Sequence, residues 1–209
     1  MARRIPDATI RRLPAYLRAL ESVRERRLTS FELGRRTGFS SEQVRKDLAY
    51  FGAFGTRGVG YEVAALEEQI RRILGLDQGV RAAMAGAGHL GTALARYARA
   101  MHKDVSIVAI FDNDPKRIGE EVAGLVVESV DRLEERVQAL DVSIGIIAVP
   151  AQAAQAVADR FTRAGVRGLL NFAPVSLVTD GRVYVQNIDL TLELQALAYF
   201  VRAAETARV

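Results

Sequence analysis

Residues 80–112 constrain the fold of this chain more than any other stretch of its sequence. The short apolar run Val80–Ala85 leads into the glycine-containing turn of residues 86–91, and a segment with helical apolar spacing follows. A second apolar run, residues 105–111, ends at Asp112. Strand, glycine turn, helix, strand and acid in this order predict one βαβ unit of a dinucleotide-binding fold.

Each glycine of this turn has a separate physical task. Gly86 permits a tight turn out of the strand, Gly88 lets a pyrophosphate approach the backbone, and Gly91 lets the helix pack close to the sheet. Free N–H groups and the positive dipole at the start of the helix hold the phosphates. We therefore expect the cofactor to contact the whole turn: Gly86, Ala87, Gly88, His89, Leu90 and Gly91.

Asp112 stands 21 residues beyond Gly91, where a carboxylate can accept hydrogen bonds from a ribose diol. A 2′-phosphate would be repelled there, so this acid favours NAD and NADH over NADP. Two other interpretations remain open. The turn could belong to an ordinary α/β domain, or it could hold another phosphate-bearing ligand such as coenzyme A.

Downstream of Asp112, apolar strand-like runs alternate with helical patterns. This alternation predicts an α/β fold with a doubly wound parallel sheet, the Rossmann architecture. Ligands of such sheets bind beyond the carboxyl ends of the strands. Four residues at predicted strand ends are therefore further cofactor-binding candidates: Val149, Pro150, Asn171 and Phe172.

Charge divides the chain into a basic N-terminal part and a mildly acidic remainder. Residues 1–60 contain 13 Lys and Arg against 6 Asp and Glu, a net charge of +7, and residues 61–209 carry a net charge of −3. A basic head on an acidic body favours contact between the head and a polyanion. A solvated basic face is the alternative.

Two short helices joined by a turn at Gly38 are predicted in this basic part. Residues 29–32 and 40–43 have the spacing of helix-capping sequences and begin the two helices. The second helix presents side chains that bond to bases and phosphates, which predicts a DNA-binding helix-turn-helix. The glycine-rich residues 52–60 predict a β-hairpin wing with Arg57 at its tip, although a small helical domain for protein contact is the alternative. The DNA-binding candidates are Ser41, Gln43, Arg45, Lys46, Tyr50 and Arg57.

Three segments are expected along the chain: a winged-helix DNA-binding domain over residues 1–78, a Rossmann NAD(H)-binding domain over residues 79–188, and a dimerisation helix over residues 189–209. The last helix is apolar over most of its surface and needs cover. The edge of the sheet could provide it, but we favour a second subunit in a homodimer. In the head, Pro14 is expected to interrupt the first helix, so that the main helix starts near it.

No constellation of catalytic side chains is recognisable in the sequence. The chain has no cysteine, which excludes disulfides and thiolate metal sites and fits a cytoplasmic protein. Neither His89 nor His102 belongs to a Ser/His/Asp, H-E-x-x-H or paired-carboxylate pattern, and no metal is expected. No apolar stretch is long enough to cross a membrane. The dinucleotide is therefore predicted to be a signal and not a reagent, with a small NAD-dependent oxidoreductase as the alternative.

Motifs spread over the chain also match a known family. They are IP at 5–6, RLPAY at 12–16, VRKDLAYFG at 44–52, GVGY at 58–61, GAGHLG at 86–91, FD at 111–112, VPA at 149–151, LNFAP at 170–174 and NIDL at 187–190. With these motifs the chain resembles the Rex family of bacterial redox-sensing transcriptional repressors. The resemblance runs from residue 5 to about residue 200.

The resemblance implies a homodimer of winged-helix heads and Rossmann bodies, with C-terminal helices exchanged between subunits. It implies a repressor that binds operator DNA when NADH is low, senses the NADH/NAD⁺ ratio, and is released by NADH when the angle between the heads changes. It also suggests a switch network of Arg18, Tyr97 and the partner subunit's Asp189. Without the resemblance, Tyr97 is a core-facing helix residue, Asp189 an N-cap of the last helix, and Arg18 a solvated charge.

Overall fold

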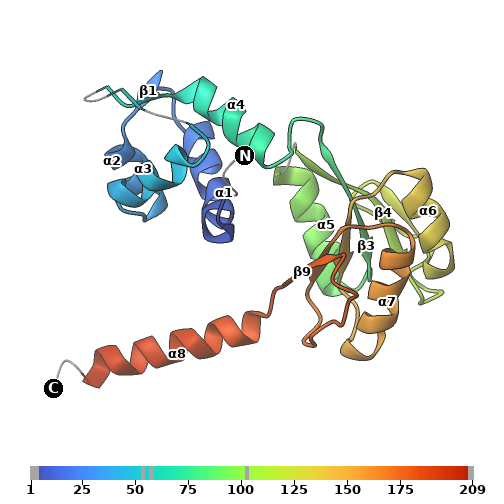
Figure 1. Ribbon diagram of the computed structural model, residues 1–209. Coiled ribbons are helices and arrows are strands. Elements are labelled where there is room, and N and C mark those ends of the chain that lie inside the picture. Colours follow the sequence, from blue (N-terminus) through green and yellow to red (C-terminus); the bar gives the residue numbers. More distant parts are fainter. Residues whose placement is uncertain (1–4, 53–54, 57–58, 102–103, 207–209) are drawn as a thin grey trace. The chain divides into compact units, whose positions relative to one another are not determined.

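The computed structural model of the protein describes residues 5–52, 55–56, 59–101 and 104–206 (Figure 1). The chain divides into two compact units, which we call the head, Met1–Gln78, and the body, Gly79–Val209. The head contains α1 Asp7–Glu21, β1 Arg27–Leu28, α2 Ser30–Thr37, α3 Ser41–Ala49, β2 Tyr61–Glu62 and α4 Val63–Ile73. The body contains β3 Val80–Ala85, α5 His89–Met101, β4 Val105–Asp112, β5 Glu121–Val122, β6 Leu125–Ser129, the 3-10 helix η1 Val130–Arg132, α6 Leu133–Ala139, β7 Ile144–Ile147, α7 Ala151–Arg163, β8 Gly168–Asn171, β9 Tyr184–Asn187 and α8 Leu190–Thr206.

Capping side chains begin the two helices of the predicted helix-turn-helix. Thr29 accepts a hydrogen bond from the Glu32 N–H, and the Glu32 carboxylate accepts one from the Thr29 N–H, which completes a capping box before α2. Ser40 caps α3 by accepting from the Gln43 N–H at 3.1 Å. The core of the head is closed by apolar side chains from all four helices: Leu13, Leu17, Leu20, Leu33, Val44, Leu48, Leu66 and Ile70.

The expectation that Pro14 would interrupt the first helix is wrong. Helix α1 begins at Asp7 and continues through Pro14 to Glu21. Proline removes one N–H from the helix, which leaves the carbonyl of Ile10 without its usual donor. Pro14 lies on the exposed face of α1, where water can satisfy that carbonyl. The buried stripe on the opposite face stabilises the whole helix.

The wing contains one strand that the sequence did not predict. Strand β1 pairs with β2 in an antiparallel sheet, with Leu28 opposite Tyr61. The glycine-rich hairpin contributes an antiparallel bridge between Thr56 and Gly60. Arg57, expected at the tip, lies outside the described residues.

Seven strands of the body form one sheet in the order β5-β6-β4-β3-β7-β8-β9. Neighbouring strands run parallel, except that β5 and β6 form an antiparallel hairpin at one edge. The chain leaves β3 toward β4 and later returns to β7 on the other side of β3. The carboxyl ends of β3 and β7 therefore flank the point where strand order reverses, which is where ligands of such sheets bind.

Successive residues of β3 and β4 face opposite sides of this sheet. Ala85 and Phe111 pack with Phe161 of α7 on one side. Met84 packs with Ala95 of α5 on the other. Figure 1 shows the helices accordingly on both faces of the sheet.

Helix α8 extends from the last strand as a helix with exposed apolar side chains. Each of its larger apolar side chains is more than half exposed in the single chain: Leu190, Leu192, Leu194, Leu197, Tyr199, Phe200 and Val201. In the part of the chain that the structure describes, no helix combines the length and apolarity needed to cross a membrane.

Candidate dinucleotide site and DNA-binding surface

The three glycines of the turn between β3 and α5 differ in what surrounds them. Gly86 has φ +102°, and a Cβ there would lie 2.3 Å from the carbonyl oxygen of Ala148. A Cβ on Gly91 would lie 1.9 Å from the carbonyl oxygen of Gly86. The chain itself therefore requires glycine at these two positions. At Gly88, by contrast, a Cβ would meet nothing within 4 Å, so open space adjoins the backbone where a pyrophosphate was expected.

Two side chains hold the Ala87 peptide in this turn. The Ala87 N–H donates to Asp112 Oδ2 at 2.6 Å, while Asp112 Oδ1 accepts from the Asp114 N–H at 2.9 Å. Arg117 donates through Nη2 to the Ala87 carbonyl oxygen and, at 3.2 Å, to Thr92 Oγ1. Because a carboxylate has about four acceptor positions, Asp112 can hold the turn and still accept hydrogen bonds from a ribose diol.

A cavity of about 490 Å³ opens at the carboxyl ends of β3, β4 and β7, within the size range of small-molecule sites. Five predicted cofactor-binding residues line it: Gly86, Gly88, Asp112, Val149 and Pro150. The other six candidates are not among its lining residues: Ala87, His89, Leu90, Gly91, Asn171 and Phe172. No group of three or more metal-ligating side chains occurs among the described residues.

Sequence reasoning missed several residues of the cavity wall, among them Arg117, Val130, Ala153, Val157 and Arg160. Most belong to η1 and α7, the helices that follow β6 and β7. The rule that selected Val149 and Pro150 stopped at the strand ends. Extending that rule by the length of the next helix could have found the residues of η1 and α7, but not Arg117.

Asn171 is fully buried, and its side chain is engaged within the body. Its Nδ2 donates to the Val175 carbonyl oxygen at 2.8 Å and to Asn187 Oδ1 at 2.9 Å, while its Oδ1 accepts from the Ala173 N–H at 3.0 Å. These bonds tie the end of β8 to β9 and fix the turn that carries half-buried Phe172.

Helix α3 and its C-cap carry five of the six predicted DNA-binding residues. Arg45 and Lys46 are exposed, and Ser41, Gln43 and Tyr50 are half-buried. A helix with this arrangement can present cations and amides to a groove of DNA.

A hollow of about 370 Å³ lies between α2, α3 and the wing. Arg45 lines it and donates through Nη1 to Ser30 Oγ at 3.1 Å. Thr56 supplies a further hydroxyl group to the lining, whereas the hydroxyl of Thr29 already donates to Glu32 Oε2 at 2.6 Å. A cation and hydroxyl donors on one concave surface suit a phosphate.

A buried acid, Asp47, connects α3 to α1. Its side chain is 0% exposed. Arg12 donates to it through Nε at 2.6 Å and Nη2 at 2.8 Å, Tyr16 through its hydroxyl at 2.8 Å, and Thr9 through Oγ1 at 2.9 Å. From α3 itself, Gln43 donates through Nε2 at 2.9 Å, which orients this predicted base contact.

These bonds decide the ionisation of Asp47. Burial acts to raise its pKa, but the hydrogen bonds from Arg12, Tyr16, Thr9 and Gln43 outweigh burial and hold the pKa below its usual value. Sequence reasoning did not single out this residue. The available signal is an acid placed between Val44 and Leu48 on the inward stripe of α3.

The three predicted switch residues occupy different elements. Arg18 is exposed on α1, and Tyr97 is 54% exposed on α5, so the reading of Tyr97 as a core residue is wrong. Asp189 is the N-cap of α8, because its Oδ1 accepts from the Thr191 N–H at 2.8 Å. Their action as a network remains a proposal.

Comparison with known proteins places the chain in a family. The family model "Putative DNA-binding protein N-terminus" matches residues 4–49, and "CoA binding domain" matches residues 77–175. The redox-sensing transcriptional repressor Rex of Natranaerobius thermophilus is 46% identical over 200 residues, covering 94% of this chain and 91% of the relative. The chain belongs to the Rex family.

Solved structures of a Rex-family repressor, RSP, agree with this membership. RSP in complex with NAD⁺ and operator DNA has a TM-score of 0.89 at 34% identity, covering 99% of this chain and 96% of RSP. RSP in complex with NADH has a TM-score of 0.85 at 33% identity, covering 98% and 97%. Membership in Rex confirms the predicted fold class, a winged-helix head followed by a Rossmann body. It also confirms the prediction of a redox-sensing transcriptional repressor and not an enzyme.

Proposed function

We propose that this chain binds operator DNA as a homodimer when NADH is scarce, and leaves the operator when NADH binds to the body. One observation carries the proposal. Open space at Gly88 adjoins a cavity lined by Asp112, in the same chain as a basic helix-turn-helix. RSP, which was solved with NAD⁺ and operator DNA and also with NADH, supports it. Because operator DNA and the NADH pool share the bacterial cytoplasm, we propose that the protein acts there.

The body's own residues suit NAD(H). The N–H groups of residues 88–91, at the start of α5, would hold the pyrophosphate, because those of Gly86 and Ala87 already donate to the Phe111 carbonyl oxygen and to Asp112. Asp112 would accept hydrogen bonds from the hydroxyls of the adenosine ribose. Val149 and Pro150 would cover the apolar face of the bound cofactor. Phe172, positioned by Asn171, would lie toward the nicotinamide, whose reduced form is neutral and whose oxidised form is a cation. NADH supplies no hydride to a substrate in this scheme and acts only as a ligand.

The apolar surface of α8 supports the proposed homodimer. Leu194, Leu197, Phe200 and Val201 are each more than half exposed in the single chain, and about 25 cal/mol is gained per Å² of apolar surface removed from water. An equivalent helix from a second subunit would provide cover. We propose the segments 1–78, 79–188 and 189–209 as DNA-binding, NAD(H)-binding and dimerisation segments.

The proposed switch acts through the difference in affinity of NADH for two states of the dimer. A ligand shifts an equilibrium only by its differential affinity, and a change from mostly bound to mostly released requires about 5 kcal/mol. Arg18, Tyr97 and the partner subunit's Asp189 would exchange contacts between these states. On the DNA, Arg45 and Lys46 would contact the major groove, joined by Ser41, Gln43, Tyr50 and Arg57.

A gel-shift titration with a palindromic operator probe tests the proposal. NADH should dissociate the complex, and NAD⁺ should not. Asp112→Ala should bind the operator normally and lose the response to NADH, whereas Asp159→Ala, an exposed acid on α7, should respond as the unmodified protein does. Failure to bind any probe at low salt would overturn the DNA-binding role.

The family model for a coenzyme A-binding domain supports one second candidate. If the protein binds the operator but ignores both NADH and NAD⁺, coenzyme A is the next ligand to titrate. Equal affinity for NADH and NAD⁺ in calorimetry would rule out redox sensing without affecting the DNA-binding role.

A further inference from the structure

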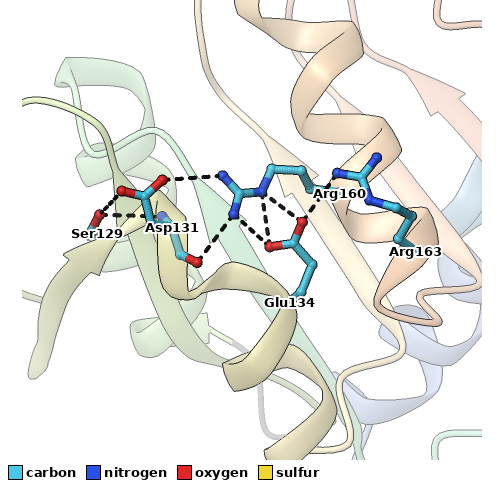
Figure 2. A network of polar contacts seen from close by, with 5 residues as sticks. All are labelled: Ser129, Asp131, Glu134, Arg160 and Arg163. Atoms are coloured by element: carbon cyan, nitrogen blue, oxygen red, sulfur yellow. Dashed lines mark hydrogen bonds and ion pairs between the residues drawn. The ribbon is translucent and has the colours of Figure 1, made fainter.

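The cavity of the body has a wall that the dinucleotide motif does not explain. Arg160 of α7 lines it together with Val130 and Val157. Its side chain is 24% exposed and lies between two acids of η1 and α6, Asp131 and Glu134 (Figure 2). A cation beside two valines needs either a structural or a ligand-binding reason.

Glu134 holds the guanidinium of Arg160 in a fixed plane. Arg160 Nε is 2.9 Å from both carboxylate oxygens of Glu134, and Nη2 is 2.7 Å from Oε2. Nη2 also donates to the main-chain carbonyl oxygen of Asp131 at 3.2 Å. These bonds use the Nε proton and both Nη2 protons, so rotation of the group is restrained.

Nη1 of Arg160 is bound more loosely. Its ion-pair partner is Asp131 Oδ1 at 3.6 Å, which exceeds hydrogen-bond length, and the Asp131 side chain is 87% exposed. The Nη1 protons and the two faces of the guanidinium are therefore the parts of Arg160 available to a ligand.

The ion pair is intact at neutral pH. The hydrogen bond from Arg160 is the main cause that lowers the pKa of Glu134 to about 2, with a further contribution from Arg163. The hydrogen bond to Glu134 in turn raises the pKa of Arg160. Glu134 thus presents a permanently charged guanidinium at the cavity.

The chemistry of this wall suits a purine. Asp112 lines the same cavity and would take the ribose of the adenosine half, so the base attached to that ribose would enter this space. A planar guanidinium stacks on aromatic faces and donates to ring nitrogens, and the neighbouring valines cover the rest of a flat ring.

We propose that Arg160 is a binding residue for the adenine of the dinucleotide, and that Glu134 is the positioning residue that holds its guanidinium in the cavity wall. This inference rests on the proposed NAD(H) site. It adds two residues that the glycine-turn motif does not contain.

Isothermal titration calorimetry of the full chain tests the assignment with three probes. NADH and ADP-ribose contain adenine, and reduced nicotinamide mononucleotide does not. Arg160→Met should weaken NADH and ADP-ribose by the same factor, roughly 5–30-fold for a desolvated cation over an aromatic ring. Its affinity for the mononucleotide should be unchanged. Glu134→Gln should weaken the two adenine probes by a smaller factor and also spare the mononucleotide.

Arg163→Met is the matched control. Arg163 donates to the same Glu134 at 3.2 Å, is 63% exposed, and is not among the residues that line the cavity. Its removal should leave all three affinities unchanged. If Arg160→Met fails to fold, Arg160→Lys, which keeps the charge and loses the planar fork, should show an intermediate loss.

The outcomes separate the two proposals. If the unmodified protein binds NADH, and Arg160→Met binds ADP-ribose with the same affinity as the unmodified protein does, the proposed role of Arg160 is wrong and the proposed function stands. A loss shared by all three probes would show a structural role only. If the unmodified protein binds neither adenine probe, the NAD(H) site and the role of Arg160 both fail.

Discussion

Two of the arginine–carboxylate pairs, Arg12–Asp47 in the head and Arg160–Glu134 in the body, lie in different surroundings. Asp47 in the head is fully buried and accepts hydrogen bonds from four side chains, whereas Glu134 in the body is 29% exposed. Breaking a buried pair costs about 3–5 kcal/mol, and an exposed pair contributes about 0–1 kcal/mol. The same pairing is therefore structural in the head. In the body the pair contributes little to stability, so Arg160 can be used to bind a ligand.

The largest effect is expected from Asp47→Ala. The substitution leaves the Arg12 cation and the Tyr16 and Thr9 hydroxyls without their shared acceptor, so the head should lose about 3–5 kcal/mol of stability. Hydrogen exchange of the α1 and α3 amides in the full chain measures this loss. A loss below about 1 kcal/mol would mean that burial does not distinguish the two carboxylates.

Tyr16→Phe should have an intermediate effect. It removes one donor to Asp47 but keeps the ring, which packs edge-on against Phe39 with the ring centroids 5.7 Å apart. Asp47 Oδ2 still accepts from Arg12 Nε, so the loss is that of one hydrogen bond to a charged group, about 1.5–3 kcal/mol. The same exchange measurement should place this variant between the unmodified protein and Asp47→Ala. A loss equal to that of Asp47→Ala would show that the hydroxyl carries the whole network.

Acid should weaken the head more than the body. The pKa of Asp47 is lower in the folded chain than its unfolded value of about 3.9, so its contribution is present above that pH and is lost as the pH falls through the folded pKa. The pKa of Glu134, about 2, acts in the same direction, but solvent screens that pair.

Exchange protection followed from about pH 5 to pH 2 should therefore fall further in α1 and α3 than in α6 and α7. Asp47→Asn should reduce the difference. Equal losses in the two units would contradict the comparison.

The smallest effects on stability are expected from two substitutions in the body, Glu134→Gln and Arg163→Met. The ion pairs of Glu134 with Arg160 and Arg163 are partly exposed, so thermal denaturation of Glu134→Gln should show a loss of under about 1 kcal/mol. The loss of stability for Arg163→Met should be smaller still, close to zero. A loss above about 2 kcal/mol for Glu134→Gln would mean that this pair is structural, as Asp47 is.

Local patterns explain what could be predicted from the sequence. The turn at Gly86–Gly91 and the caps at Thr29 and Ser40 depend on residues within a few positions of each other, and the structure has them where the sequence predicted. The alternation of strands and helices likewise follows from local periodicity. In contrast, β1 and β5 have two residues each, which is too short for a periodic signal.

The tertiary structure decided which residues far apart in the sequence meet. Pro14 stays within α1 because the opposite face of that helix is buried against the rest of the head. Asp47 becomes a structural acid because Arg12 of α1 reaches it across 35 positions, and Arg160 reaches the cavity wall because Glu134 of α6 holds it across 26. The sequence by itself determined the class of fold, the glycine turn and the helix-turn-helix, since short-range sterics and hydrogen bonds encode them. Burial and pairing of distant side chains arise only when the chain packs, and that packing decided the roles of Asp47 and Arg160.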